Sequence, residues 1–256
     1  VEEFINKPAS KSLVLRHDID RFPGNGLKMA KMESDMGISA SYYYRIISSV
    51  YREEQIKLVQ DLGHEVSYHY EDLSLHKGDY EKAIKHFEYQ LKKFRKYSPA
   101  LTICRHGSPL SKWDNKLIWE KYNYRDFGLI GDTEFDIDYN EVFYISDNGM
   151  GWNKTSTSVR DKVKSRFDIP IKNTSHLIDL IKYGKLPDHV AINAHPDTFF
   201  DFGPKWILNA AFIKTKNIAK WFIVRYLNLS IRFKIVRLSK KYLSGCFLPN
   251  SFNVAD

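Results

Sequence analysis

Side chains that can bind a metal ion or move a proton follow five short, largely apolar segments of this chain. They are Asp18, Asp20, His69, Glu71, His106, Asp147 and His195. In a fold of alternating strands and helices, the loops that follow the strands meet at one end of the sheet. We therefore expect these carboxylates and imidazoles to form one site of the kind that holds a hydrolytic metal.

Asp18 and Asp20 end the segment LVLRHDID and are two residues apart. On a strand, this spacing places both carboxylates on the same side. Two carboxylates in one pocket repel each other unless a cation neutralises them. A divalent metal would do so, with one Asp as ligand and the other as general base toward water. In the alternative, Asp20 caps the next turn and Asp18 pairs with Arg16 or Arg21.

His69 and Glu71 show the same spacing at the end of HEVSYHYE. Both residue types bind metals, although a single histidine in a strand is more often a hydrogen-bonded core residue. Tyr68 and Tyr70 alternate with them and are expected to pack on the opposite face.

His195 ends the segment HVAINAH and precedes Pro196-Asp197. A histidine at this position can act as the general acid that protonates a leaving amine. Asp197 is the carboxylate nearest in sequence that could orient it.

Two loops can contribute to substrate binding. His106 precedes Gly107-Ser108-Pro109, whose backbone amides can approach a substrate, although these residues can also serve only the turn. Asp147 begins a glycine-containing loop that ends at Trp152. Its indole can stack on a sugar ring, or it can cover the edge of the core.

The apolar periodicity predicts a parallel α/β fold, most simply an irregular or seven-stranded (β/α) barrel. The expected strands are 13–20, 38–46, 64–70, 101–107, 125–130, 141–146 and 189–195. The expected helices are 25–36, 52–62, 79–97, 114–122 and 174–184, the first two ending at glycines.

The composition fits one catalytic body. A chain of 256 residues with 43% hydrophobic content can bury a substantial core. Cys104 and Cys246 are far apart, which argues against a disulfide framework or a thiolate zinc site. The first residues do not read as a secretory signal, and no apolar run approaches roughly 18 residues. We therefore expect a cytoplasmic protein.

The net charge of +8 comes from residues 201–256. The cations of this segment are Lys205, Lys214, Lys216, Lys220, Arg225, Arg232, Lys234, Arg237, Lys240 and Lys241, against only Asp201 and Asp256. We expect a body of residues 1–200 and a basic helical extension of residues 201–256. The extension packs on the barrel with a solvated basic face, or attaches the protein to anionic lipid at the inner face of the membrane. No nucleic-acid-binding motif is present.

Taken together, these motifs resemble the polysaccharide deacetylases of carbohydrate esterase family 4, the NodB-homology domain. HDID is similar to the Asp-Asp motif of that family, which implies Asp18 as general base and Asp20 as metal ligand. GHEVSYHYEDL is similar to the motif with two metal-binding histidines, of which His69 is the first. The second falls on Leu73, which cannot bind a metal.

The resemblance therefore leaves the third ligand to His106, Glu71 or His76, of which we prefer His106 and Glu71. CRHGSP stands where the family has Arg-x-Pro-Tyr, with Arg105 in the arginine place. It lacks the tyrosine, so the amides of Gly107 and Ser108 would contact the oxyanion. DNGMGW, with Asp147 and Trp152, resembles the fourth motif, and INAHP, with His195 as general acid, resembles the fifth.

RHDID, GHEVSYHYEDL, ICRHGSPLSKWDN and YRDFG are closer still to a divergent branch found in bacterial surface-polysaccharide gene clusters. The resemblance, over residues 13–200, implies a zinc-dependent N-deacetylase of an acetamido sugar in an O-antigen, capsule or related precursor. Hydrolysis of another amide, as in allantoinase-like relatives, is one alternative. Glycan binding without cleavage is another, because Leu73 occupies a ligand position.

Overall fold

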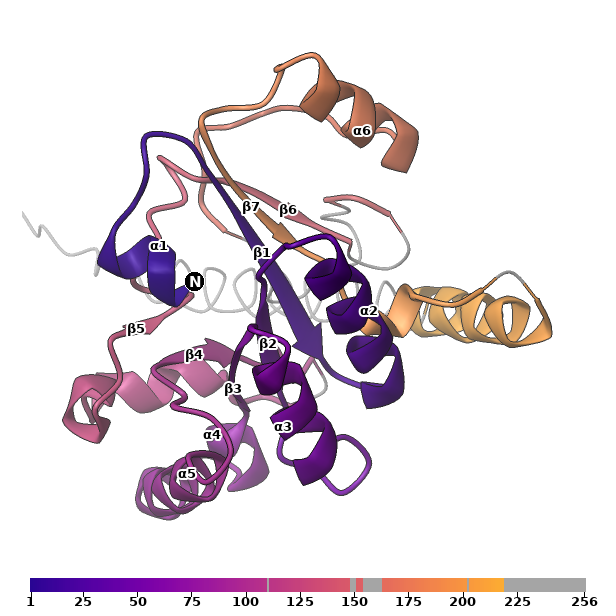
Figure 1. Cartoon of the computed structure of the whole chain (residues 1–256). Helices are drawn as coiled ribbons and strands as arrows, with labels where there is room; N and C mark the ends of the chain where they lie inside the picture. Colours follow the sequence, from indigo (N-terminus) through magenta and orange to yellow (C-terminus); the bar gives the residue numbers. More distant parts are fainter. Residues whose placement is uncertain (110, 148–150, 154–162, 202, 219–256) are drawn as a thin grey trace, which may run out of the picture.

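Seven parallel strands form one curled sheet in the order β5-β4-β3-β2-β1-β7-β6 (Figure 1). The computed structural model describes residues 1–109, 111–147, 151–153, 163–201 and 203–218. The strands are β1 (Ser12–Ile19), β2 (Ser41–Tyr44), β3 (Glu65–Tyr70), β4 (Thr102–Arg105), β5 (Gly131–Asp132), β6 (Phe143–Ser146) and β7 (His189–Asn193). β5 and β6 are the two edges of this sheet, so the described residues form an incomplete barrel, which confirms the predicted fold class.

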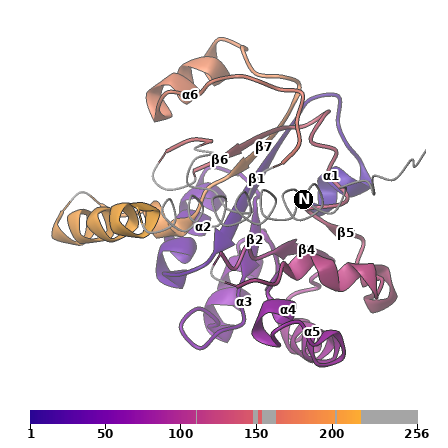
Figure 2. The ribbon, with the colours of Figure 1, turned by 180° about the vertical axis from the view of Figure 1, so that it is seen from behind.

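Helices surround the curled sheet, most of them on its outer face, whereas the first helix lies at one end of the sheet and packs Phe4 and Ile5 against the cluster of Val14 and Tyr43 (Figures 1 and 2). They are α1 (Glu2–Asn6), α2 (Pro23–Asp35), α3 (Glu53–Asp61), α4 (Asp72–Leu75), α5 (Tyr80–Phe94) and α6 (Thr174–Lys182). Short 3-10 helices span Asn115–Glu120, Tyr124–Phe127 and Pro196–Thr198. The chain leaves α3 through Gly63, whose φ of +89° suits a residue without a side chain.

Tyrosines fill the space between the sheet and its helices because side chains alternate along a strand. Tyr42, Tyr44, Tyr68 and Tyr70 are buried in the cluster that contains Phe87 of α5. Tyr43 points the other way, into a second cluster inside the curl of the sheet. The predicted packing of Tyr68 and Tyr70 is confirmed. Because side chains alternate along the strand, His69 between them faces the inside of the curled sheet.

Residues 125–130 do not form the predicted strand. A 3-10 helix spans Tyr124–Phe127, and the strand β5 begins only at Gly131. The side chain of Asn123 accepts a hydrogen bond from the backbone N–H of Arg125, which starts the helical turn. The chain then leaves this turn through Gly128, at φ +70°.

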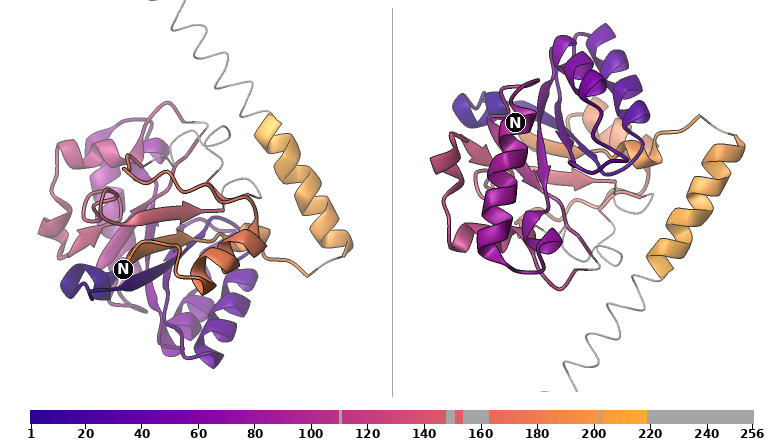
Figure 3. Two further views of the ribbon diagram at one scale, coloured as in Figure 1. Left: turned by 90° about the horizontal axis from the view of Figure 1, so that it is seen from above. Right: turned by 90° about the horizontal axis from the view of Figure 1, so that it is seen from below.

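A helix over residues 204–218 lies beyond the carboxyl ends of the strands (Figure 3). Its Phe212 ring lies 4.8 Å from the Arg21 guanidinium, and Asn209 donates a hydrogen bond of 2.6 Å to the Asp197 carbonyl. The rest of the predicted extension, 219–256, lies outside the described residues. Within the described part of the chain, no helix combines the length and hydropathy needed to cross a membrane.

Candidate metal centre

Asp20, His69 and His106 converge at the carboxyl ends of β1, β3 and β4. Oδ1 of Asp20 lies 3.5 Å from Nε2 of His69 and 3.4 Å from Nε2 of His106. This Oδ1 atom is buried and has no hydrogen-bond partner. An unpartnered carboxylate oxygen facing two imidazole nitrogens is the donor set that a divalent metal of the zinc type binds.

Both imidazoles are held through their other nitrogen. Nδ1 of His69 donates to the carbonyl oxygen of Cys104 at 3.0 Å, and Nδ1 of His106 donates to Oε2 of Glu71 at 2.9 Å. With Nδ1 held in this way, each ring turns its Nε2 toward Oδ1 of Asp20. The two rings meet edge to face, with centroids 5.2 Å apart. The residues present therefore fit a metal ion, with outer partners that orient both histidines.

The charge at Asp20 is stabilised by its neighbours. Burial opposes ionisation, but His106 and His69 hold the pKa of Asp20 well below its usual range. This carboxylate is therefore ionised and ready to act as a ligand at neutral pH.

Both oxygens of Glu71 are already engaged. Nε and Nη2 of Arg45 donate to Oε1 and Oε2 at 2.8 and 2.7 Å, and His106 shares Oε2. Glu71 thus orients His106, which differs from the ligand role expected from the sequence. The sequence analysis did not identify Arg45, which directly follows β2. The signal was a cation at the end of a strand, because β2 lies between β1, which leads to Asp20, and β3, which leads to Glu71.

Asp18 lies in a buried polar network on β1. Arg16 contacts it twice, at 3.1 and 3.2 Å, and Nδ2 of Asn193 donates to its Oδ2 at 2.9 Å. Tyr144 joins the network, because its hydroxyl accepts from Arg16 at 2.9 Å. Burial alone would raise the pKa of Asp18. The charge of Arg16 has the largest opposing effect, His69 and His195 add to it, and the pKa of Asp18 is lowered from its usual value. The pairing of Asp18 with Arg16, which the sequence offered as an alternative, is therefore present. It coexists with the candidate ligand atoms of Asp20, His69 and His106.

His195 follows β7 and is held by Asp147, at the end of β6. Nδ1 of His195 donates to Oδ1 of Asp147 at 2.5 Å, and its backbone N–H also donates to this carboxylate. Nε2 of His195 lies 4.0 Å from Oδ2 of Asp18. Burial opposes the charged imidazole, but Asp147, together with Asp18 and Asp20, raises the pKa of His195 to about 10. His195 is therefore protonated at neutral pH.

Asp197 does not orient His195, in contrast to what the sequence suggested. Its Oδ2 accepts a hydrogen bond of 2.7 Å from Nε of Arg21. Asp147, expected to contact substrate, takes the orienting place instead.

Asp18, His69 and Cys104 form another group, and in the described part of the chain it is the one whose three candidate ligand atoms all lie within 4.8 Å of one another. We favour the set built on Asp20, because Oδ2 of Asp18 already accepts hydrogen bonds from Arg16 and Asn193, and its Oδ1 is paired with Nε of Arg16 at 3.1 Å. Burial also raises the pKa of the Cys104 thiol, which disfavours the thiolate form that metals bind.

Other predicted contacts with substrate are engaged elsewhere. Arg105 pairs with Asp114 and Glu134 at 2.8 and 2.9 Å. The hydroxyl of Ser108 accepts hydrogen bonds from Ser74 and Asn115. Gly107 lies half-buried in the loop after β4.

Trp152 packs against the cluster around Phe143 and Leu177 and donates to Thr174 at 3.1 Å, which is the core-edge alternative. Residues 148–150 of its motif lie outside the described residues. Leu73 is fully buried in the core, so its position in the chain is not part of the site. His76 meets His86 edge to face, with ring centroids 4.9 Å apart, rather than joining His69.

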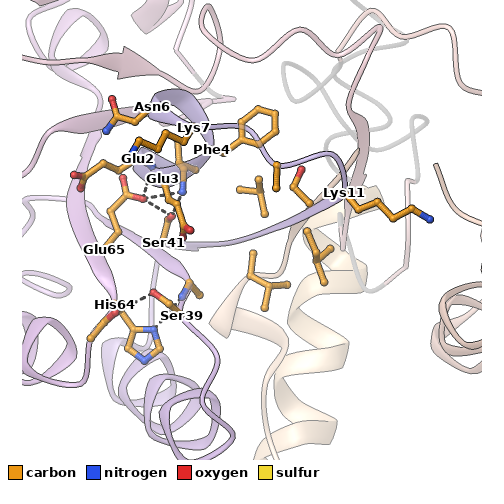
Figure 4. Close-up of a pocket in the computed structure, with 18 of the residues that line it drawn as sticks. Glu2, Glu3, Phe4, Asn6, Lys7, Lys11, Ser39, Ser41, His64 and Glu65 are labelled. Carbon is orange, nitrogen blue, oxygen red and sulfur yellow. Dashed lines mark hydrogen bonds and ion pairs between the residues drawn. The ribbon is translucent and has the colours of Figure 1, made fainter. Parts of the chain in front are cut away.

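A cavity of about 680 Å³ lies at the opposite end of the sheet, where β1, β2 and β3 begin (Figure 4). Lys11, Ser41, His64 and Glu65 are among its lining residues. Because the candidate ligands lie at the other ends of these strands, this cavity is separate from the metal centre.

No family model matches the chain, and no curated protein matches it. Solved structures do match. A CE4 esterase of Streptococcus mutans is 15% identical with a TM-score of 0.44, over 86% of this chain and 85% of that one. A family 4 carbohydrate esterase of Streptomyces lividans is 10% identical with a TM-score of 0.41, over 82% and 90%.

A CE4 family pseudoenzyme of Bacillus anthracis is 11% identical with a TM-score of 0.41, over 84% of this chain and 63% of that one.

Proposed function

We propose that this protein is a zinc-dependent hydrolase that removes the acetyl group from an acetamido sugar of a bacterial surface polysaccharide or its precursor. The observation that carries the proposal is the buried, unpartnered Oδ1 of Asp20 facing Nε2 of both His69 and His106. The sequence motifs support the sugar substrate.

Asp20, His69 and His106 would hold the ion, with Glu71 orienting His106 from behind. Zinc held there would supply a nucleophilic water at neutral pH and polarise the acetyl carbonyl. Further ligands would be water or substrate oxygens, as in catalytic zinc sites with three protein ligands.

Asp18 acts as the general base in this proposal. It is ionised, it is held in place by Arg16 and Asn193, and it lies two residues from Asp20. It takes the proton of the water that attacks the acetyl carbon. The amides of Gly107 and Ser108 remain the predicted contacts for the oxyanion.

His195 acts as the general acid. Its charged imidazole stands with Nε2 only 4.0 Å from Asp18, so base and acid face the same amide bond. His195 gives its proton to the sugar nitrogen as the carbon–nitrogen bond breaks, and acetate and a free amino sugar result. Asp147 keeps the ring in position and stabilises its charge.

The first test is the zinc content of the purified full chain, measured with acetate release from N-acetylglucosamine oligosaccharides. We expect near-stoichiometric zinc in the wild type and its loss in Asp20→Ala and His69→Ala. Asp188→Ala is a matched control, because Asp188 is exposed and pairs with Lys11 at the far end of β1, away from the candidate ligands.

A wild-type protein that binds no metal after reconstitution would overturn the hydrolase and favour glycan binding without cleavage. A protein that binds zinc but cleaves ureides instead of N-acetyl sugars would overturn the substrate class alone.

A further inference from the structure

The helix over residues 204–218 turns an apolar stripe toward solvent. Ile207, Leu208, Phe212 and Ile218 are 55%, 71%, 52% and 51% exposed. At 3.6 residues per turn, these four residues and Ala211 fall on one side along the length of the helix. The other side faces the protein body, because Asn209 bonds to it and Ile213 is 3% exposed. The apolar side therefore faces outward although the helix is docked.

Cations border this stripe on both sides. On a helical projection, Lys205 lies next to the Phe212 edge and Lys214 next to the Ile207 edge, and both are exposed. The helix contains no acidic residue, and none follows it before Asp256. An apolar side flanked by lysines is the pattern of a helix that lies in the surface of an anionic bilayer.

The stripe lies near the mouth of the candidate metal centre. Arg21 directly follows the candidate ligand Asp20, and its guanidinium stacks on Phe212 at 4.8 Å. The same guanidinium also lies over the ring of Phe22, at 4.9 Å. The helix lies beyond the carboxyl ends of the strands (Figures 1 and 3), and the candidate ligands Asp20, His69 and His106 lie at the carboxyl ends of β1, β3 and β4. A surface that binds the stripe therefore comes close to the site.

We propose that the helix over residues 204–218 binds this protein to an anionic lipid surface, with the stripe of Ile207, Leu208, Ala211, Phe212 and Ile218 inserted among the acyl chains. Lys205 and Lys214 contact the lipid phosphates. The charge pattern favours this occupant over a second copy of the chain, because two such helices would bring their lysines together. The proposal does not depend on the reaction at the metal centre.

The test is sedimentation of the full chain with vesicles. We expect binding to vesicles that contain phosphatidylglycerol, weaker binding at high salt, and little binding to pure phosphatidylcholine. Leu208→Asp should lower the partition coefficient by about tenfold or more, because one leucine is lost from the buried side. Tyr183→Asp is the matched control, because Tyr183 is 74% exposed and lies at the end of α6.

An unchanged thermal unfolding temperature in Leu208→Asp would show that the variant is folded. An unchanged zinc content would show that the metal centre is intact, so that a loss of lipid binding is distinguished from a failure of the proposed hydrolase. The proposal is overturned if the wild type does not sediment with anionic vesicles, or if Leu208→Asp sediments equally well. It is also overturned if the wild type forms a dimer without lipid that Leu208→Asp dissociates, since the stripe would then bind a second copy.

Discussion

The carboxylate of Asp147 accepts hydrogen bonds from both the side chain and the backbone of His195, at 2.5 and 3.0 Å. Asp147 directly follows β6, and His195 lies two residues beyond the end of the adjacent strand β7. Thr198 adds a third hydrogen bond to the same carboxylate, at 2.9 Å. The imidazole is thereby fixed with Nε2 toward Asp18.

Asp147→Asn should shift the alkaline limb of the kcat/KM profile to lower pH. A general acid must be protonated, so activity holds below the His195 pKa of about 10 and is lost as pH rises through it. Loss of the partner carboxylate should lower this pKa by about 1–3 units. Asp197→Asn, which removes the partner of Arg21, serves as control. An alkaline limb that does not move in Asp147→Asn would contradict the role of His195.

Glu71→Gln should weaken zinc binding by about 10–100-fold, because Glu71 orients the His106 ring and makes its Nε2 a stronger metal ligand. Competition with a chelator would measure this affinity. Glu134→Gln is a close control, since Glu134 also lies between two cations, Arg105 and Lys116, without contacting His106. Equal affinities in the two variants would rule out the orienting role.

Cys104→Ala and His106→Ala separate the two possible ligand sets. If Asp20, His69 and His106 hold the ion, zinc content should fall sharply in His106→Ala and stay near the wild-type level in Cys104→Ala. The opposite result would assign the ion to Asp18, His69 and Cys104. Metal analysis after dialysis against a fixed free zinc concentration gives the answer.

Phe87→Ala should lower the free energy of unfolding by about 3–5 kcal/mol, the usual cost of removing a buried phenyl ring. Phe87 is fully buried, and its ring contacts the rings of Tyr68 and Trp119, at 5.5 and 5.0 Å between centroids. Tyr89→Ala on the same helix should change stability by less than about 0.5 kcal/mol, because Tyr89 is 65% exposed. Urea unfolding compares the two, and a similar loss in both would contradict the assignment of the core.

The alternation of side chains along strands made much of the site predictable. Because parallel strands end at the same edge, Asp20, His69 and His106 come together although they are far apart in sequence. The same argument identified Asp18 and His195. The structure brings all five close together, and their chemical roles remain predictions.

Side-chain pairing within the site could not be read from sequence proximity. Asp197 is two residues from His195, but the 3-10 helix that begins at Pro196 turns it toward Arg21. Asp147 is far from His195 in sequence and yet lies beside it, because Ser146 pairs with Asn193 across β6 and β7. Such partners depend on strand order, which periodicity does not give.

The extension was less predictable for a different reason. Over all of residues 201–256 the cations do not gather on one side at helical spacing. Within the described helical residues 204–218, the apolar side is clear. A pattern of this kind depends on where the helix begins, and helix ends are poorly marked in the sequence.

The pairing of β1 with β7 has a consequence for how the protein matures. Ser12 is paired with His189, so the first strand of the sheet acquires one of its two neighbours only after nearly 190 residues have been made. During synthesis, Asp18 has neither Asn193 nor His195 beside it until β7 has left the ribosome. Contacts between segments so distant in sequence form slowly. The proposed general base and general acid therefore come together only when the last strand is in place.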